Sequence, residues 1–97
     1  MIAHPSVRGV AFTGSAAGGA QVAALAGKHV KKSMLELGGS DAFIVLDDAD
    51  LDVAVNQAVS GRLRNTGQAC NNSKRFIIHS SLYDAFKKRL AEELKSH

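Results

Sequence analysis

The sequence has 97 residues, 45% of them hydrophobic, which is enough for one small domain with a core. Its net charge of +3 is modest, and its basic clusters carry no interleaved aromatic residues, so we expect no nucleic-acid partner. It holds no run of about 20 apolar residues and no basic segment leading into an apolar run, so we expect no membrane association and no signal peptide. A single cysteine cannot close an internal disulfide, and these features together predict a soluble, cytoplasmic α/β chain.

The first elements in chain order predict a strand–helix–strand unit. Residues 7–12 (VRGVAF) predict a short buried strand, and a Gly/Ser turn follows it. Residues 16–26 are rich in helix-favouring Ala, Leu and Gln, and Gly27 predicts the end of that helix. Residues 31–37 predict a second strand. Two strands joined by a helix imply parallel pairing with a right-handed crossover.

A double glycine at 38–39 predicts a boundary between two structural units. After it, residues 42–46 (AFIVL) form a continuous apolar run of strand length. Leu, Ala and Val then recur at helical spacing, which predicts a helix that begins at Asp48 or Asp50 and ends near 65–67.

The last elements are a short strand and a helix. Residues 76–79 predict the strand, and Ser80 or Ser81 predicts the N-terminal cap of the helix. The expected order is therefore β-α-β-β-α-β-α. The apolar residues of the last helix recur every four positions, at Leu82, Phe86, Leu90 and Leu94.

A glycine-rich turn, GSAAGG at 14–19, lies between the first predicted strand and helix. Backbone N–H groups at such a helix start can bind a phosphate. The turn lacks the Lys and Ser/Thr of a Walker A loop, and it lacks the pattern G-x-G-x-x-G. Taken alone, it fits a purely structural turn as well as a phosphate-binding turn.

Two residues are candidates for chemistry. Cys70 lies in a polar loop that contains glycine, and Lys74 and Arg75 are near enough in sequence to favour a thiolate. Free cysteines are nevertheless most often inert and buried. Glu36 lies near the end of a predicted buried strand, where it is either outward-facing or a desolvated carboxyl that acts as a general base.

The sequence predicts no metal site. Asp48, Asp50 and Asp52 have the spacing that opens an EF-hand loop, but Val53 and Val59 stand where that loop needs Gly and Glu. The four histidines do not lie at zinc-ligand spacing from one another or from the cysteine.

Three stretches taken together resemble one family. FTGSAAGG (12–19), LELGGSDAFIVLDDADLD (35–52) and GRLRNTGQACNNSKRF (61–76) are similar, in order and spacing, to the NAD(P)-dependent aldehyde dehydrogenases. LELGG and GQ-x-C resemble the two active-site signatures of that family, with Cys70 following Glu36 by 34 positions. The residues of the second and third stretches are most similar to the succinate-semialdehyde dehydrogenase-like branch of the family.

The resemblance implies an α/β fragment of the aldehyde dehydrogenase fold. Residues 1–38 would be the C-terminal part of the NAD(P)-binding domain, and residues 39–97 the N-terminal part of the catalytic domain. Cys70 resembles the nucleophile that forms a thioester with an aldehyde, with its backbone N–H in the oxyanion hole, and Glu36 resembles the base that activates water or thiol. The implied cofactor is NAD or NADP. The residues implied to lie beside the cofactor are Thr13, Gly14, Ser15 and Gly19 at the pyrophosphate, and Leu37 and Gly38 near the nicotinamide.

The chain also departs from the family. Asn71, Asn72 and Ser73 stand where small residues are more usual, which would alter the floor of the aldehyde pocket. Family members are homo-oligomers several times longer, so we expect an internal piece from a truncated, split or frameshifted gene. Such a piece would be inactive or nearly inactive alone. The alternative is a non-catalytic module that binds other polypeptides through its open strand edges.

Overall fold

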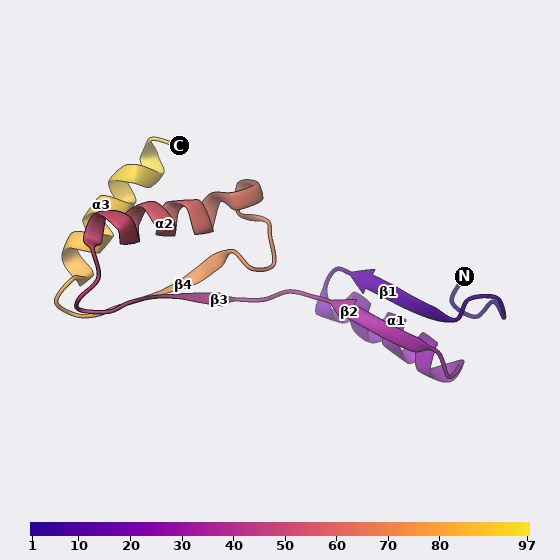
Figure 1. Ribbon diagram of the computed structural model, residues 1–97. Helices are drawn as coiled ribbons and strands as arrows, with labels where there is room; N and C mark the ends of the chain where they lie inside the picture. The colour runs from indigo at the N-terminus through magenta and orange to yellow at the C-terminus, as the bar shows by residue number, and fades with distance from the viewer. The chain divides into compact units, whose positions relative to one another are not determined.

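The computed structural model describes all 97 residues, which form two compact units, Met1–Gly38 and Gly39–His97 (Figure 1). Each unit contains a two-stranded parallel sheet. The elements follow the order β-α-β-β-α-β-α, with one short 3₁₀ turn before the last strand, so the predicted order and the α/β class are confirmed. None of the helices has the length and apolar character that crossing a bilayer requires.

The first unit is a strand–helix–strand unit, as predicted. Its elements are β1 (Gly9–Thr13), α1 (Ala16–Lys28) and β2 (Lys32–Glu36). β1 and β2 pair in parallel, with Phe12 opposite Leu35. The parallel pairing expected from the sequence is confirmed.

α1 ends one residue beyond the predicted end near Gly27, but Gly27 is not its C-terminal cap. The helix continues to Lys28, and the chain turns at Val30, whose φ of 54° is left-handed. The N–H of Val30 donates to the carbonyl of Gly27, and the N–H of Lys31 donates to that of Ala26, which is the pattern of a Schellman motif. A valine therefore occupies the position that usually favours glycine.

The second unit contains two parallel strands and two helices. β3 and β4 form the sheet, and α2 and α3 pack together through their side chains. The exposed Arg89 of α3 also pairs with Asp52 of α2. The elements of this unit are β3 (Asp41–Val45), α2 (Leu51–Leu63), the 3₁₀ turn η1 (Arg64–Gly67), β4 (Ser73–Ile78) and α3 (Tyr83–Lys95).

The core of the second unit forms where α2 and α3 meet the sheet. Phe86 of α3 is 2% exposed, and its ring lies 6.3 Å from that of Phe76 on β4. Asp50 caps α2, since its carboxylate accepts from the N–H of Val53 at 3.0 Å. The helical spacing seen in the sequence is confirmed, because the buried residues of α2 are Ala54, Val55, Ala58 and Val59.

Two boundaries near the C-terminus differ from the prediction. β4 begins at Ser73 rather than at residue 76. Neither Ser80 nor Ser81 caps α3, because the helix starts after Leu82 without a side-chain cap. The hydroxyl of Ser81 instead contacts Nδ1 of His79 at 2.8 Å.

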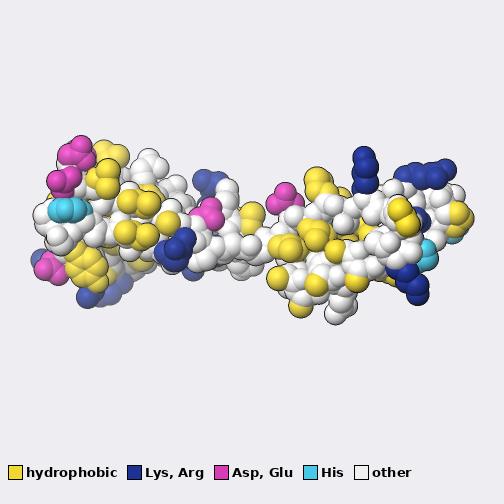
Figure 2. All heavy atoms as spheres, turned by 90° about the horizontal axis from the view of Figure 1, so that it is seen from below, with side chains coloured by type: hydrophobic (Ala, Val, Ile, Leu, Met, Phe, Trp, Pro, Cys, Tyr) yellow, Lys and Arg dark blue, Asp and Glu magenta, His cyan; other side chains and the backbone are white.

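The strands are less buried than the sequence predicted. In β2 only Leu35 is partly buried, and on β3 and β4 the register partners Ile44 and Ile77 are 62% and 50% exposed. Hydrophobic side chains accordingly lie open at the surface of both units (Figure 2). Parallel strands are normally covered on both faces, and in this chain helices cover only one.

Candidate active site

The turn between β1 and α1 brings together the residues expected near a cofactor phosphate. Ser15 caps α1, since its hydroxyl oxygen accepts from the N–H of Gly18 at 3.1 Å. Its hydroxyl proton donates to no acceptor in the chain. The first turn of α1 carries no acidic residue, so no side chain neutralises the positive end of the helix dipole.

The glycines of this turn are favoured by close packing. A Cβ on Gly14 would lie 2.7 Å from the ring of Phe12, and one on Gly18 would lie 3.0 Å from the same ring. A Cβ on Gly19 would lie 2.6 Å from the side chain of Leu37. The helix start therefore fits closely over the ends of β1 and β2, and the structural interpretation of the Gly turn accounts for all three glycines.

Glu36 ends β2 beside this turn. Its backbone carbonyl accepts from the N–H of Gly14 at 3.0 Å, which connects the phosphate-type turn to the LELGG stretch. Its side chain is exposed. Of the two alternatives that the sequence left open, the outward-facing one holds within the chain, because no layer covers the end of a two-stranded sheet.

Cys70 is an exposed free cysteine in the loop between η1 and β4. The approach to it is conformationally strained. Asn65 and Thr66 have φ values of 50° and 58°, and Gly67 has 75°. Left-handed conformations cost energy in residues other than glycine, and clusters of them often occur at functional sites. No hydrogen bond of the loop uses the N–H of Cys70.

Asn72 connects this loop to the end of α2. It is 1% exposed, and its amide nitrogen donates to the carbonyls of Arg62 at 3.0 Å and Arg64 at 2.8 Å. Its Oδ1 is buried without a partner. From the sequence, Asn72 was only a departure from a small side chain, and its structural role was not predicted. A polar residue at a position that usually holds a small one was the available signal.

Lys74 and Arg75 donate to backbone carbonyls. The ammonium of Lys74 lies 2.9 Å from the carbonyl oxygen of Cys70, and Nε of Arg75 lies 2.8 Å from that of Ser40. Both side chains therefore order the backbone near Cys70.

The candidate residues divide between the two units. The first unit contains all the candidates except the cysteine, namely Thr13, Gly14, Ser15, Gly19, Glu36, Leu37 and Gly38. Cys70 lies in the second unit. Nowhere do three or more His, Cys, Asp or Glu side chains come together as metal ligands.

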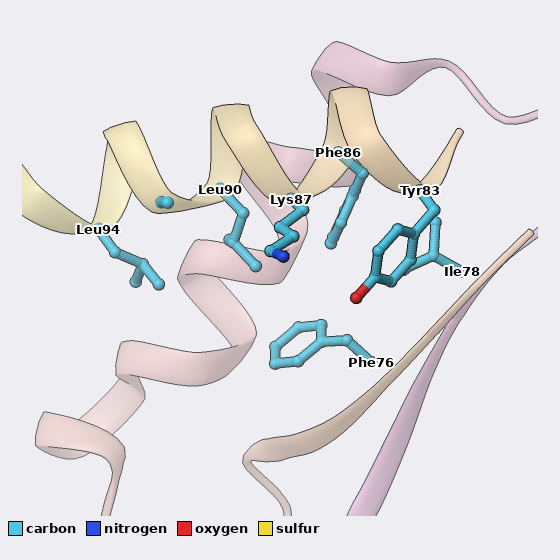
Figure 3. Close-up of a pocket in the computed structure, with 8 residues that line it drawn as sticks. Phe76, Ile78, Tyr83, Phe86, Lys87, Leu90 and Leu94 are labelled. Atoms are coloured by element: carbon cyan, nitrogen blue, oxygen red, sulfur yellow. The ribbon is translucent and has the colours of Figure 1, made fainter. Parts of the chain in front are cut away.

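An apolar groove also lies in the second unit, between β4 and α3. Figure 3 shows the aromatic rings of Phe76, Tyr83 and Phe86 along it, with Leu90 and Leu94 further down the helix and Lys87 as the only charged residue. None of its lining residues belongs to the candidate site.

All 97 residues match the family model described as the aldehyde dehydrogenase family. The chain is 59% identical over 92 residues to the NADP(+) succinate-semialdehyde dehydrogenase of Deinococcus radiodurans. The aligned segment covers 95% of the chain and 19% of that relative. It is 48% identical over 96 residues to the protein of the same name from Mycolicibacterium paratuberculosis, covering 99% of the chain and 20% of the relative.

Solved structures give the same result. The crystal structure of succinic semialdehyde dehydrogenase from Streptococcus pyogenes in complex with NADP+ matches with a TM-score of 0.92 and 52% identity, over 98% of the chain and 21% of that structure. A succinate-semialdehyde dehydrogenase from Burkholderia pseudomallei matches with a TM-score of 0.92 and 46% identity, over 98% of the chain and 20% of that structure.

The chain belongs to the aldehyde dehydrogenase family. Its similarity to succinate-semialdehyde dehydrogenases confirms the branch suggested by the sequence. The chain spans about a fifth of the length of the curated relatives it matches.

Proposed function

We propose that this chain carries the nucleophile and the general base of an NADP-dependent oxidation of an aldehyde to a carboxylic acid, with succinate semialdehyde as the substrate. The observation that carries the proposal is the loop of Cys70. The only cysteine of this chain lies exposed in that loop, and the backbone N–H of Cys70 has no intramolecular acceptor. The side chains of Asn72 and Lys74 bind backbone carbonyls on either side of it.

We further propose that residues 1–38 are part of the cofactor-binding domain and residues 39–97 part of the catalytic domain. The turn at Thr13–Ser15 fits the pyrophosphate of NADP because Ser15 retains a hydroxyl donor and the first turn of α1 has no acidic side chain. Gly19 lets Leu37 approach the helix start, which would leave Leu37 and Gly38 beside the nicotinamide. The cofactor, when bound, supplies the hydride acceptor.

Cys70 would act by nucleophilic catalysis. Its thiolate attacks the aldehyde carbonyl and forms a thiohemiacetal, and its free N–H donates to the oxygen that becomes negative. After oxidation the acyl group is held on the sulfur as a thioester. Water then attacks that carbonyl, the carbon–sulfur bond breaks, and the carboxylic acid leaves.

Glu36 would accept the proton of the attacking water. A carboxylate suits this role when it is partly desolvated. Within the chain Glu36 is exposed, so the covering layer would come from the four-fifths of a full-length relative that the chain does not span. For the same reason we expect the 97-residue chain alone to show almost no turnover.

A second candidate is a non-catalytic interaction module. The observation that favours it is the open apolar face of β3 and β4, where Ile44 and Ile77 are at least half exposed, as is Leu46 directly after β3. Large exposed apolar patches mark interaction surfaces.

A chimera tests the proposed function. The matching segment of the Deinococcus radiodurans relative is replaced by this chain, and NADP reduction with succinate semialdehyde is measured. We expect turnover that Cys70→Ser lowers by about 10⁴-fold or more and Glu36→Gln by about 10²–10⁴-fold. Ser80→Ala, at an exposed loop position, is the matched control. An active Cys70→Ser chimera would refute the proposal.

A further inference from the structure

β4 contains an irregularity directly after the Cys70 loop. Asp41 of β3 pairs with Ser73, and the next residue, Ala42, pairs with Arg75. Lys74 is thus the extra residue of a β-bulge, with no partner on β3. Bulges commonly occur beside functional sites, where they redirect a side chain.

The bulge lets the side chain of Lys74 turn away from the core-facing side of β4, which it would otherwise share with Phe76. In a regular strand, residues 74 and 76 lie on the same face, and Phe76 packs against the core of the second unit. A lysine ammonium is costly to bury there. With the bulge, the Lys74 side chain is exposed and its ammonium lies over the preceding loop.

The ammonium binds three backbone carbonyls of this loop. Nζ of Lys74 lies 3.3 Å from the oxygen of Ala69, 2.9 Å from that of Cys70 and 3.4 Å from that of Asn72. An ammonium has three N–H donors and no acceptor, so this set uses its full capacity. Hydrogen bonds from a charged donor are also stronger than neutral ones.

Two of these carbonyls belong to the peptide groups on either side of the Cys70 Cα atom. Because a peptide group is planar, a bond to the carbonyl of Ala69 also fixes the N–H of Cys70. The bond to the carbonyl of Cys70 fixes the plane of the next peptide group, between Cys70 and Asn71. Together the two planes determine the direction of the Cα–Cβ bond, and hence the region in which Sγ can lie.

We propose that Lys74 is a positioning residue, which orients both the thiol and the N–H of Cys70 through the carbonyls around it. This inference rests on the proposed function, since the orientation matters only if Cys70 is the nucleophile. Asn72 connects the loop to the end of α2 through other carbonyls, so removal of Lys74 would disorder the Cys70 peptide groups without detaching the loop.

The test uses the whole 97-residue chain with Lys74→Met, which keeps an unbranched side chain and removes the donors. Cys70, the only cysteine, is alkylated with 3-bromo-1,1,1-trifluoroacetone, and its ¹⁹F signal is recorded together with amide hydrogen exchange of unlabelled protein. We expect the signal to move toward its position in the denatured chain. We also expect the N–H of Asn72, which donates to the carbonyl of Ala69, to exchange at least fivefold faster. The melting temperature should fall only slightly, because the Lys74 bonds lie in an exposed loop outside the core.

Two further variants isolate the cause. Lys88→Met removes an exposed lysine of α3 and should leave both readouts as in the original chain. Lys74→Arg keeps the charge and N–H donors and should restore most of the protection. The inference is overturned if Lys74→Met matches the original chain, or if Lys74→Arg protects no better than methionine. If Lys74→Met changes the ¹⁹F signal and the exchange rate while the Cys70→Ser chimera is active, the proposed function is refuted. The orientation of Cys70 by Lys74 would then still stand.

Discussion

Asn72 is the one buried polar side chain of this protein, and it stabilises the loop of the proposed nucleophile. Its two N–H donors are used by the carbonyls of Arg62 and Arg64, while its Oδ1 is buried without a partner. A buried acceptor without a hydrogen bond costs free energy. The loop therefore tolerates an unfavourable group in order to fix the residue two positions after Cys70.

Asn72→Asp is expected to destabilise the second unit by about 1–3 kcal/mol, because a carboxylate would place oxygens against two carbonyls that now accept N–H donors. Thermal unfolding followed by circular dichroism checks this value. Asn71→Asp, the same change at the exposed neighbouring position, is the control. Equal melting temperatures for the two variants would show that the Asn72 bonds contribute nothing.

At the same scale, the sequence pointed to a loop around Cys70 but not to the contacts that hold that loop. The glycine and polar residues around Cys70 indicated an exposed loop, and the thiol is exposed. The sequence left Glu36 either outward-facing or desolvated, and its side chain is exposed, since covering depends on layers that local sequence does not encode. The contacts of Asn72 and Lys74 also depend on where the backbone carbonyls lie, which the residue pattern does not show.

At the scale of elements, hydrophobic spacing predicted the helices and strands, and their ends were predicted less well. The spacing along α2 matched its buried residues because that helix packs on a core. The end of α1 was predicted to within one residue, but Gly27 was wrongly predicted as its cap, because the Schellman bonds form three residues later, around Val30. The predicted serine caps of α3 failed because Ser81 contacts His79 instead.

Val30→Gly should stabilise the first unit by about 1 kcal/mol, because glycine adopts the left-handed conformation without the penalty of a side chain. Val30 is 95% exposed, so its removal loses almost no burial. Urea unfolding measures the change. Val53→Gly, at an exposed position inside α2, should have the opposite sign with about the same size. A destabilised Val30→Gly chain would contradict the role given to that turn.

At the scale of the whole molecule, the chain has the starting elements of a larger parallel architecture. Each unit has only two parallel strands, and helices cover one face of each sheet. About four-fifths of each relative lies outside the matched segment. The exposed apolar face of β3 and β4 is uncommon for parallel sheets, which are normally covered on both faces.

The isolated chain is therefore expected to self-associate as its concentration rises. Combining Ile44→Glu with Ile77→Lys places opposite charges on register partners of that face and should shift the chain toward monomer, because both positions are at least half exposed. Sedimentation velocity at several concentrations measures the effect. Val30→Glu, at a 95% exposed turn position of the first unit, is the control. Unchanged association in the double variant would show that another surface is responsible.

The central claim is that Cys70 carries the acyl group during aldehyde oxidation. The most direct test is to quench the chimera with acid during turnover of succinate semialdehyde and NADP, and to analyse its peptides by mass spectrometry. The account predicts a succinyl thioester on the peptide that contains Cys70, absent from the Cys70→Ser chimera. An active chimera that carries no acyl group on Cys70, or carries it on another residue, would contradict the account.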